Sequence, residues 1–106
     1  MSTTRAEWLR TATPQLIADV VLYPTSEGGK NLTAQSGWGC PCCCTKSIPA
    51  SGWDGWPILE KPLAPGDRRR LGFVFLSGEQ AADTLRKAGT FYLWEGRFIG
   101  EAVVVS

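Results

Sequence analysis

The side chains best suited to chemistry are four cysteines, all between residues 40 and 44. Cys40 and Cys43 have the spacing of a zinc knuckle, and Cys42 and Cys44 would share one face of a strand. Zinc sites usually pair two such knuckles, but the sequence has no other cysteine and no histidine. Two interpretations stay open: a metal or redox-sensing thiol site, and small apolar side chains that fill a core.

The absence of histidine also removes much enzyme chemistry, because no Ser-His or Cys-His pair and no imidazole proton shuttle can form. Carboxylates such as Asp54 and Asp67 have no spacing that indicates an acid–base pair. Gly28-Gly29-Lys30 is not a phosphate-binding loop, because Pro24 and Asn31 replace the required glycine and hydroxyl residue. We therefore expect a protein that is not an enzyme, has no cofactor and binds no nucleotide.

Length and composition indicate a single small globular domain. The 106 residues are 43% hydrophobic and include five tryptophans, which is enough for a core without disulfides. The net charge of +1 means that any contact with nucleic acid or membrane must be local. No apolar stretch has the length of a signal or membrane segment. We expect a cytoplasmic protein with reduced thiols and no membrane partner.

The sequence divides into an N-terminal extension, residues 1–15, and a β-rich domain, residues 16–106. In the extension, the capping-box spacing of Thr4 and Glu7 predicts a short helix over Arg5–Thr11. A second helix is predicted over Glu79–Ala88 from the spacing of alanine and leucine. Strands are predicted at residues 16–23, 42–48, 58–60, 69–76, 91–95 and 97–105. Short strands separated by Gly and Pro favour an all-β barrel or sandwich, and the apolar run Val103-Val104-Val105, which would be an aggregation hazard at an open edge, argues for closure.

Four short motifs occur in an order and separation that resemble the C-terminal, third domain of bacterial translation elongation factor Tu. They are Glu27-Gly28-Gly29-Lys30, Ser36-Gly37-Trp38, Pro65-Gly66-Asp67 and Glu95-Gly96-Arg97-Phe98-Ile99-Gly100. The resemblance covers residues 16–105 and implies a closed, six-stranded antiparallel Greek-key barrel, here with one or two short added helices. In that family the domain follows a GTPase domain and a second barrel, and it holds the T-arm of aminoacyl-tRNA.

The resemblance also implies candidate binding residues. In the family, the hairpin tip that corresponds to Glu95, Gly96 and Arg97 lies at the tRNA backbone, and Lys30 is a further candidate. Arg97 and Lys30 could pair with phosphates, and Gly96 permits close approach of a backbone. The family's Arg-Pro-Gln stretch is replaced here by Gly39-Cys40-Pro41-Cys42, so part of the tRNA-binding surface is missing.

Two other groups could bind a partner. Three tryptophans lie beside glycines in predicted loops, where they could plug the barrel or grip a peptide or base: Trp38, Trp53 and Trp56. Of these we expect Trp53 to be the most exposed. The basic run Arg68-Arg69-Arg70 either protects a sheet edge from mispairing or, through Arg69, joins the hairpin cations in a phosphate-binding patch.

Together these observations predict a non-catalytic binding module. Loops rich in Trp and Gly, with a net charge near zero, suit a protein surface, so another protein is the expected partner. The first alternative is an RNA- or tRNA-binding module that acts through Lys30, Arg69 and Arg97. The second is a thiol- or metal-dependent sensor at the cysteines.

Overall fold

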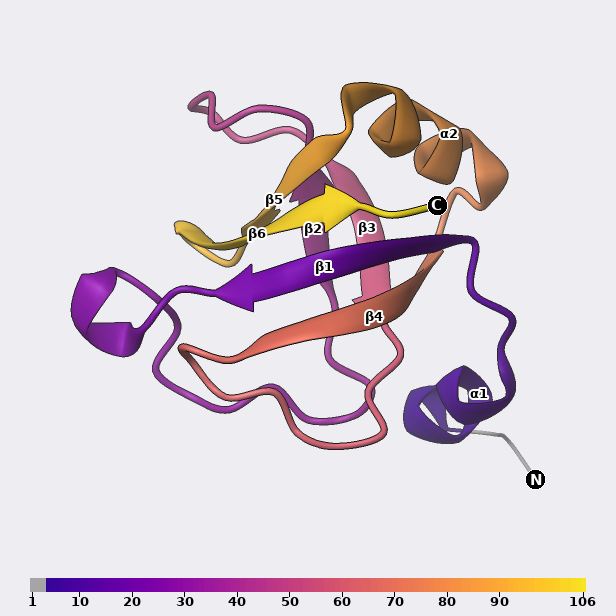
Figure 1. The fold of residues 1–106 in the computed structure, drawn as a ribbon, viewed down its shortest axis with the longest axis horizontal. Helices are drawn as coiled ribbons and strands as arrows, with labels where there is room; N and C mark the ends of the chain where they lie inside the picture. The colour runs from indigo at the N-terminus through magenta and orange to yellow at the C-terminus, as the bar shows by residue number, and fades with distance from the viewer. Residues whose placement is uncertain (1–3) are drawn as a thin grey trace.

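Six antiparallel strands close into a barrel in the computed structural model, which describes residues 4–106 (Figure 1). The strands are β1 (Leu16–Leu22), β2 (Cys40–Cys43), β3 (Trp53–Pro57), β4 (Arg68–Phe75), β5 (Thr90–Trp94) and β6 (Phe98–Val104). Around the barrel their order is β1-β4-β3-β2-β5-β6, and β6 returns to β1. The order β1-β4-β3-β2 is a Greek key. The predicted fold class is confirmed.

Two helices flank the barrel at the positions that the sequence predicts (Figure 1). Helix α1 (Arg5–Thr11) begins where the Thr4 hydroxyl accepts the Glu7 N–H, and Leu9 anchors it in the core. Helix α2 (Glu79–Ala88) buries its alanine and leucine face and ends at Gly89. A 3-10 turn, η1 (Thr25–Glu27), follows β1. Residues 1–3 of the predicted extension lie outside the described residues.

None of the helices among residues 4–106 has the length and apolar character needed to cross a bilayer.

Four of the predicted strands agree with the structure to within one residue, but two are wrong. Strand β2 ends at Cys43 rather than continuing over residues 42–48, because the chain after Cys44 runs into an exposed loop. The predicted strand at residues 58–60 is replaced by β3, which ends at Pro57. Gly55 in β3 faces the Phe75 ring so closely that any side chain would collide with it. The glycine therefore marks a close approach of two strands, not a turn.

Side chains from the strands fill the barrel, and in β1, β4 and β5 the core residues alternate along the strand. Phe73 lies at the centre, edge-to-face with Phe91 at 5.4 Å and stacked with Phe75 at 6.0 Å between ring centroids. Leu71, Phe73 and Phe75 share the interior face, as the sequence predicts. Cys42 contributes to the same core from β2. These three rings bury a large apolar area at the centre of a core whose other members are mainly aliphatic.

Truncation of the central ring should therefore destabilise the fold strongly. We expect Phe73→Ala to lower the free energy of unfolding by about 3–5 kcal/mol, measured by urea denaturation followed by circular dichroism. The control Val103→Ala, at an exposed position of β6, should lose less than about 1 kcal/mol. Equal losses for the two variants would contradict this description of the core.

Candidate functional site

The hairpin between β5 and β6 meets the loop that follows β1. The hairpin turn is closed by the Glu95 N–H, which donates to the Arg97 carbonyl at 2.8 Å. Gly96, between them, has a φ of +73°, a conformation that other residues adopt with strain. Lys30, from the loop after η1, lies beside this turn and lines a shallow pocket of about 370 Å³ together with the three turn residues. The structure thus brings together the four residues that the resemblance implies.

We call the contact between the hairpin tip, residues 95–97, and the loop around Lys30 the junction. Lys30 is buried inside this junction. Its side chain is only 7% exposed, and its Nζ donates to the Leu32 carbonyl at 2.5 Å. The same Nζ lies 3.8 Å from Glu95 Oε1 and 5.5 Å from the centroid of the Trp38 ring. Glu95 Oε2 accepts the Trp38 indole N–H at 2.6 Å. These contacts fasten the loop to the hairpin, because the buried ammonium group of Lys30 finds its partners on both segments.

Arg97 is the cation of this junction that remains exposed. One of its guanidinium nitrogens donates to the Gly29 carbonyl at 3.0 Å, which orients the side chain. Leu32, on the same pocket, is 75% exposed. The tip can therefore offer one guanidinium and one apolar side chain to a ligand.

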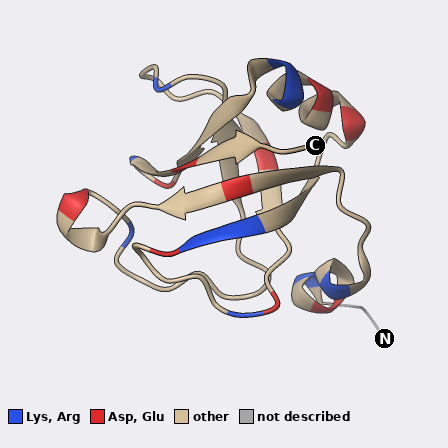
Figure 2. Cartoon of the chain, in the orientation of Figure 1, with Lys and Arg blue, Asp and Glu red and all other residues tan. Residues whose placement is uncertain are grey.

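Arg69 has partners of its own, separate from those of Lys30 and Arg97. Its guanidinium donates to the carbonyls of Lys61 and Pro62 at 2.7 and 3.1 Å. The side chains of the basic run alternate, with Arg69 half-buried and its two neighbours exposed. Figure 2 shows the run as the basic first half of β4. These two hydrogen bonds hold the start of β4 against the chain segment that precedes it.

The cysteines are divided between two faces of β2. Cys40 and Cys42 belong to the barrel core, whereas Cys43 is buried against Gly52 outside it, and Cys44 is half-buried. A side-chain hydrogen bond with Cys40, together with burial, raises the pKa of Cys42 well above its ordinary value. Burial also raises the pKa of Cys43.

Raised thiol pKa values disfavour the thiolates that bind metals or act as nucleophiles. Within the described part of the chain, no group of three or more His, Cys, Asp or Glu residues is placed to hold a metal ion. The packing of Cys40 and Cys42 in the core matches the role of small apolar side chains.

All three tryptophans are half-buried, but only Trp38 lies in a loop. The predicted loop position of Trp53 and Trp56 is wrong, because both belong to strand β3. Trp38 and Trp53 pack against the core, in agreement with a plugging role, and Trp53 also lines a pocket of about 410 Å³ with Cys44. Trp56 instead faces outward, where its ring lies edge-on to the Trp8 ring at 6.4 Å.

Sequence reasoning missed a groove at this Trp8–Trp56 pair. It has a volume of about 630 Å³ and is lined by Arg5, Trp8, Gln15, Trp56, Val74, Phe75, Leu76 and Gly78. Trp8 is 45% and Leu76 70% exposed, and the Arg5 guanidinium lies 5.1 Å from the Trp56 ring centroid. We call this surface the tryptophan groove. A signal was present in the sequence, since Trp8 and the buried Leu9 are adjacent on a short helix and cannot both face the barrel.

No protein-family model matches this chain, and no curated protein is significantly similar to it. The resemblance to the third domain of elongation factor Tu therefore stays a prediction. The barrel fold that it implies agrees with the structure, but a shared fold does not establish a family.

The indole hydrogen bond gives the first test of the junction. Trp38→Phe keeps the ring over Lys30 but removes the donor to Glu95, so we expect a loss of about 1–2 kcal/mol in unfolding free energy by urea denaturation. Trp53→Phe is the matched control, because the Trp53 indole N–H has no hydrogen-bond partner in the described range 4–106. A loss no larger than that of the control would contradict the fastening role.

The thiols give a second test. In iodoacetamide labelling at about pH 8, the native chain should be modified rapidly at Cys44 alone, since the other three thiols are buried. All four should react after denaturation, as mass spectrometry of the digested protein would reveal. Rapid labelling of Cys42 or Cys43 in the native chain would contradict their burial.

Proposed function

We propose that this chain is a non-catalytic binding module whose partner is another protein, and that the partner docks on the tryptophan groove. The observation that carries the proposal is the exposure of Trp8 and Leu76 in one groove with the half-buried Trp56 ring. Tryptophan and arginine are the residue types most enriched at the energetic centres of protein interfaces.

The groove is also pre-organised, which favours tight binding. The edge-to-face contact of Trp8 with Trp56 and the position of Arg5 over the Trp56 ring limit the conformations of all three side chains. Helix α1, which carries Arg5 and Trp8, is anchored by the buried Leu9. Side chains already ordered in the free protein lose less conformational entropy when a partner binds.

An RNA- or tRNA-binding module is the second candidate, and it rests on the exposed guanidinium of Arg97 at the hairpin tip. It is the weaker candidate, because Lys30 is buried and Arg69 donates to backbone carbonyls. A thiol-dependent sensor is weaker still, since the raised pKa values of Cys42 and Cys43 keep these groups protonated.

We further propose, from the four motifs and the Greek-key order together, that the barrel is related to the third domain of elongation factor Tu and works in the cytoplasm. Fold likeness alone does not carry a function from one protein to another. The tryptophan groove depends on α1, which lies before the region of resemblance, so its partner need not be one that the family shares.

The test is affinity capture from extract of the source cells with matched variants. We expect the wild-type chain and the control Val103→Ser/Val105→Ser, which changes two other exposed apolar residues, to retain the same protein. Trp8→Ser/Leu76→Ser should retain at least about tenfold less, as expected for loss of an interface centre. Circular dichroism would establish that both variants fold.

Two results would count against the proposal. One is recovery of the same protein by the groove variant and the control. The other is recovery of RNA without protein, in an amount that falls with Arg97→Ala and with rising salt, which would support the second candidate.

A further inference from the structure

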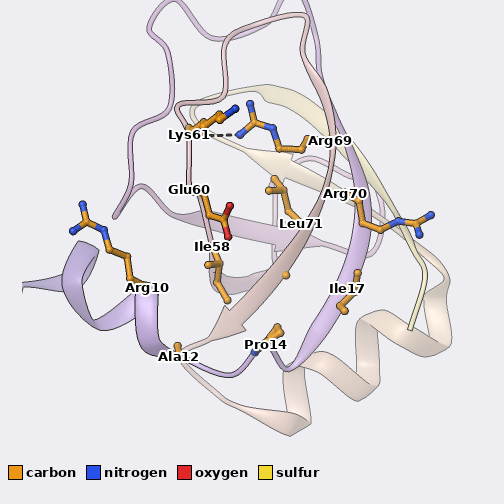
Figure 3. Close-up of a pocket in the computed structure, with 11 residues that line it drawn as sticks. Arg10, Ala12, Pro14, Ile17, Ile58, Glu60, Lys61, Arg69, Arg70 and Leu71 are labelled. Atoms are coloured by element: carbon orange, nitrogen blue, oxygen red, sulfur yellow. Dashed lines mark hydrogen bonds between the residues drawn. The ribbon is translucent and has the colours of Figure 1, made fainter.

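The barrel wall has an incomplete seam beside the first half of β4. Strand β4 pairs with β1 over residues 68–73, but with β3 only over residues 73–75. The last backbone hydrogen bond across the seam runs from the Ile58 N–H to the Gly72 carbonyl, at 2.8 Å. Beyond it the chain diverges from β4, until the Arg69 side chain bridges the gap to the Lys61 carbonyl (Figure 3).

The direction of the backbone groups in β4 follows from this hydrogen bond. Peptide groups of alternate residues in a strand point to opposite sides. The Phe73 carbonyl points to the β1 side, where it accepts the Gln15 N–H, and the Gly72 carbonyl points to the seam. The N–H and carbonyl of Arg70 must therefore face the seam as well. No backbone partner lies opposite them among residues 4–106, so the N–H and carbonyl of Arg70 are available for hydrogen bonding at the sheet edge.

A pocket of about 610 Å³ lies over this seam (Figure 3). Ile17, Ile58 and Leu71 supply apolar surface, with Pro14 at the end nearest α1. Such a mixture of apolar surface and a few polar groups is typical of a ligand site.

Cations outnumber anions around this pocket. It is lined by four cations and one carboxylate: Arg10, Lys61, Arg69, Arg70 and Glu60. Arg70 is paired with Asp19 at 2.8 Å and Arg69 donates to carbonyls. Arg10 and Lys61 are exposed and have no ion pair within the described part of the chain. The surplus charge available to a ligand is therefore positive.

We propose that this seam binds a short acidic segment of a protein partner in an extended conformation, which adds to β4 at the free edge of Arg70. The proposal rests on the proposed function, since it names the chemistry of one partner segment. The segment's backbone pairs with the N–H and carbonyl of Arg70, its carboxylates approach Arg10 and Lys61, and an apolar side chain covers Ile17 and Ile58. Strand addition of this kind draws its affinity from main-chain hydrogen bonds.

The charges argue for this occupant over a second copy of the chain. A second β4 would bring its own Arg68-Arg69-Arg70 run against the first, and like charges across an edge oppose pairing. An acidic segment would instead place negative charges opposite these arginines, which favours pairing. A nucleic acid would satisfy the charges but has no peptide group to pair with Arg70.

The test uses the full chain and a synthetic probe peptide of about eight residues with alternating Glu and Val and blocked ends. In a nuclear magnetic resonance titration, the Arg70 amide should shift, and its hydrogen exchange should slow at least about tenfold at saturation. The same peptide with Gln for Glu should bind at least about fivefold more weakly in low salt. An unchanged Arg70 amide at saturation would overturn the proposal.

Matched variants separate the backbone contact from the charges. Arg70→Pro removes the edge N–H, whereas Arg70→Ala removes only the side chain, so the proline variant should bind the peptide at least about fivefold more weakly than the alanine variant. Lys61→Glu should weaken binding by a similar factor, and Lys87→Glu, which makes the same charge change on the exposed face of α2, should not. Equal affinities within either pair would overturn the proposal.

Other occupants have their own signatures. Concentration-dependent dimerisation that Arg70→Pro abolishes would assign the seam to a second copy, and tight binding of a polyuridine probe that Lys61→Glu abolishes would assign it to nucleic acid. Either result would overturn the peptide proposal. The peptide titration does not involve Trp8 or Leu76, so its failure would leave the tryptophan groove and its capture experiment unaffected. If Arg70→Pro fails to fold, the amide exchange of the wild-type chain decides the question.

Discussion

The structure depends on β1, the strand that closes the barrel. Its backbone pairs with β4 on one side and with β6 on the other, and the Val105 N–H extends this pairing to the Ile17 carbonyl. Without β1 the remaining sheet would have two open edges, one of them ending in the apolar run Val103-Val104-Val105. Closure also brings the alternating interior residues of all six strands around Phe73, so sheet pairing and core packing support each other.

Closure is incomplete beside the first half of β4, and the seam proposed as a binding surface lies where regular pairing with β3 stops. The β3–β4 ladder begins only at Phe73, and the seam beside Arg70 is the consequence. The tryptophan groove forms where α1 meets β3 and the end of β4. A completed sheet offers side chains alone, whereas an interrupted one also offers backbone groups and concave surface.

Several charged and reactive residues that the sequence offers as site candidates make contacts within the fold instead. Lys30 and Glu95 have partners in the junction with Trp38, and Arg69 clips the seam. The cysteines follow the same principle, because burial keeps Cys42 and Cys43 in their thiol form. A residue type with the right chemistry is therefore a weaker guide to a site than the same residue left without an internal partner.

The sequence by itself determined the two helices and four strands, because capping residues and the spacing of apolar residues act within a few positions along the chain. The closed barrel was predicted from the resemblance of the four motifs, together with the short strands and the turns between them. It did not determine β3, since Gly55 resembles a turn signal until Phe75 is placed against it. The burial of Lys30 depends on Glu95, and the tryptophan groove depends on Trp8 meeting Trp56. Only the tertiary structure could decide these features, because each depends on a contact between two segments that lie far apart in the chain. Local sequence patterns do not specify which distant segments come into contact.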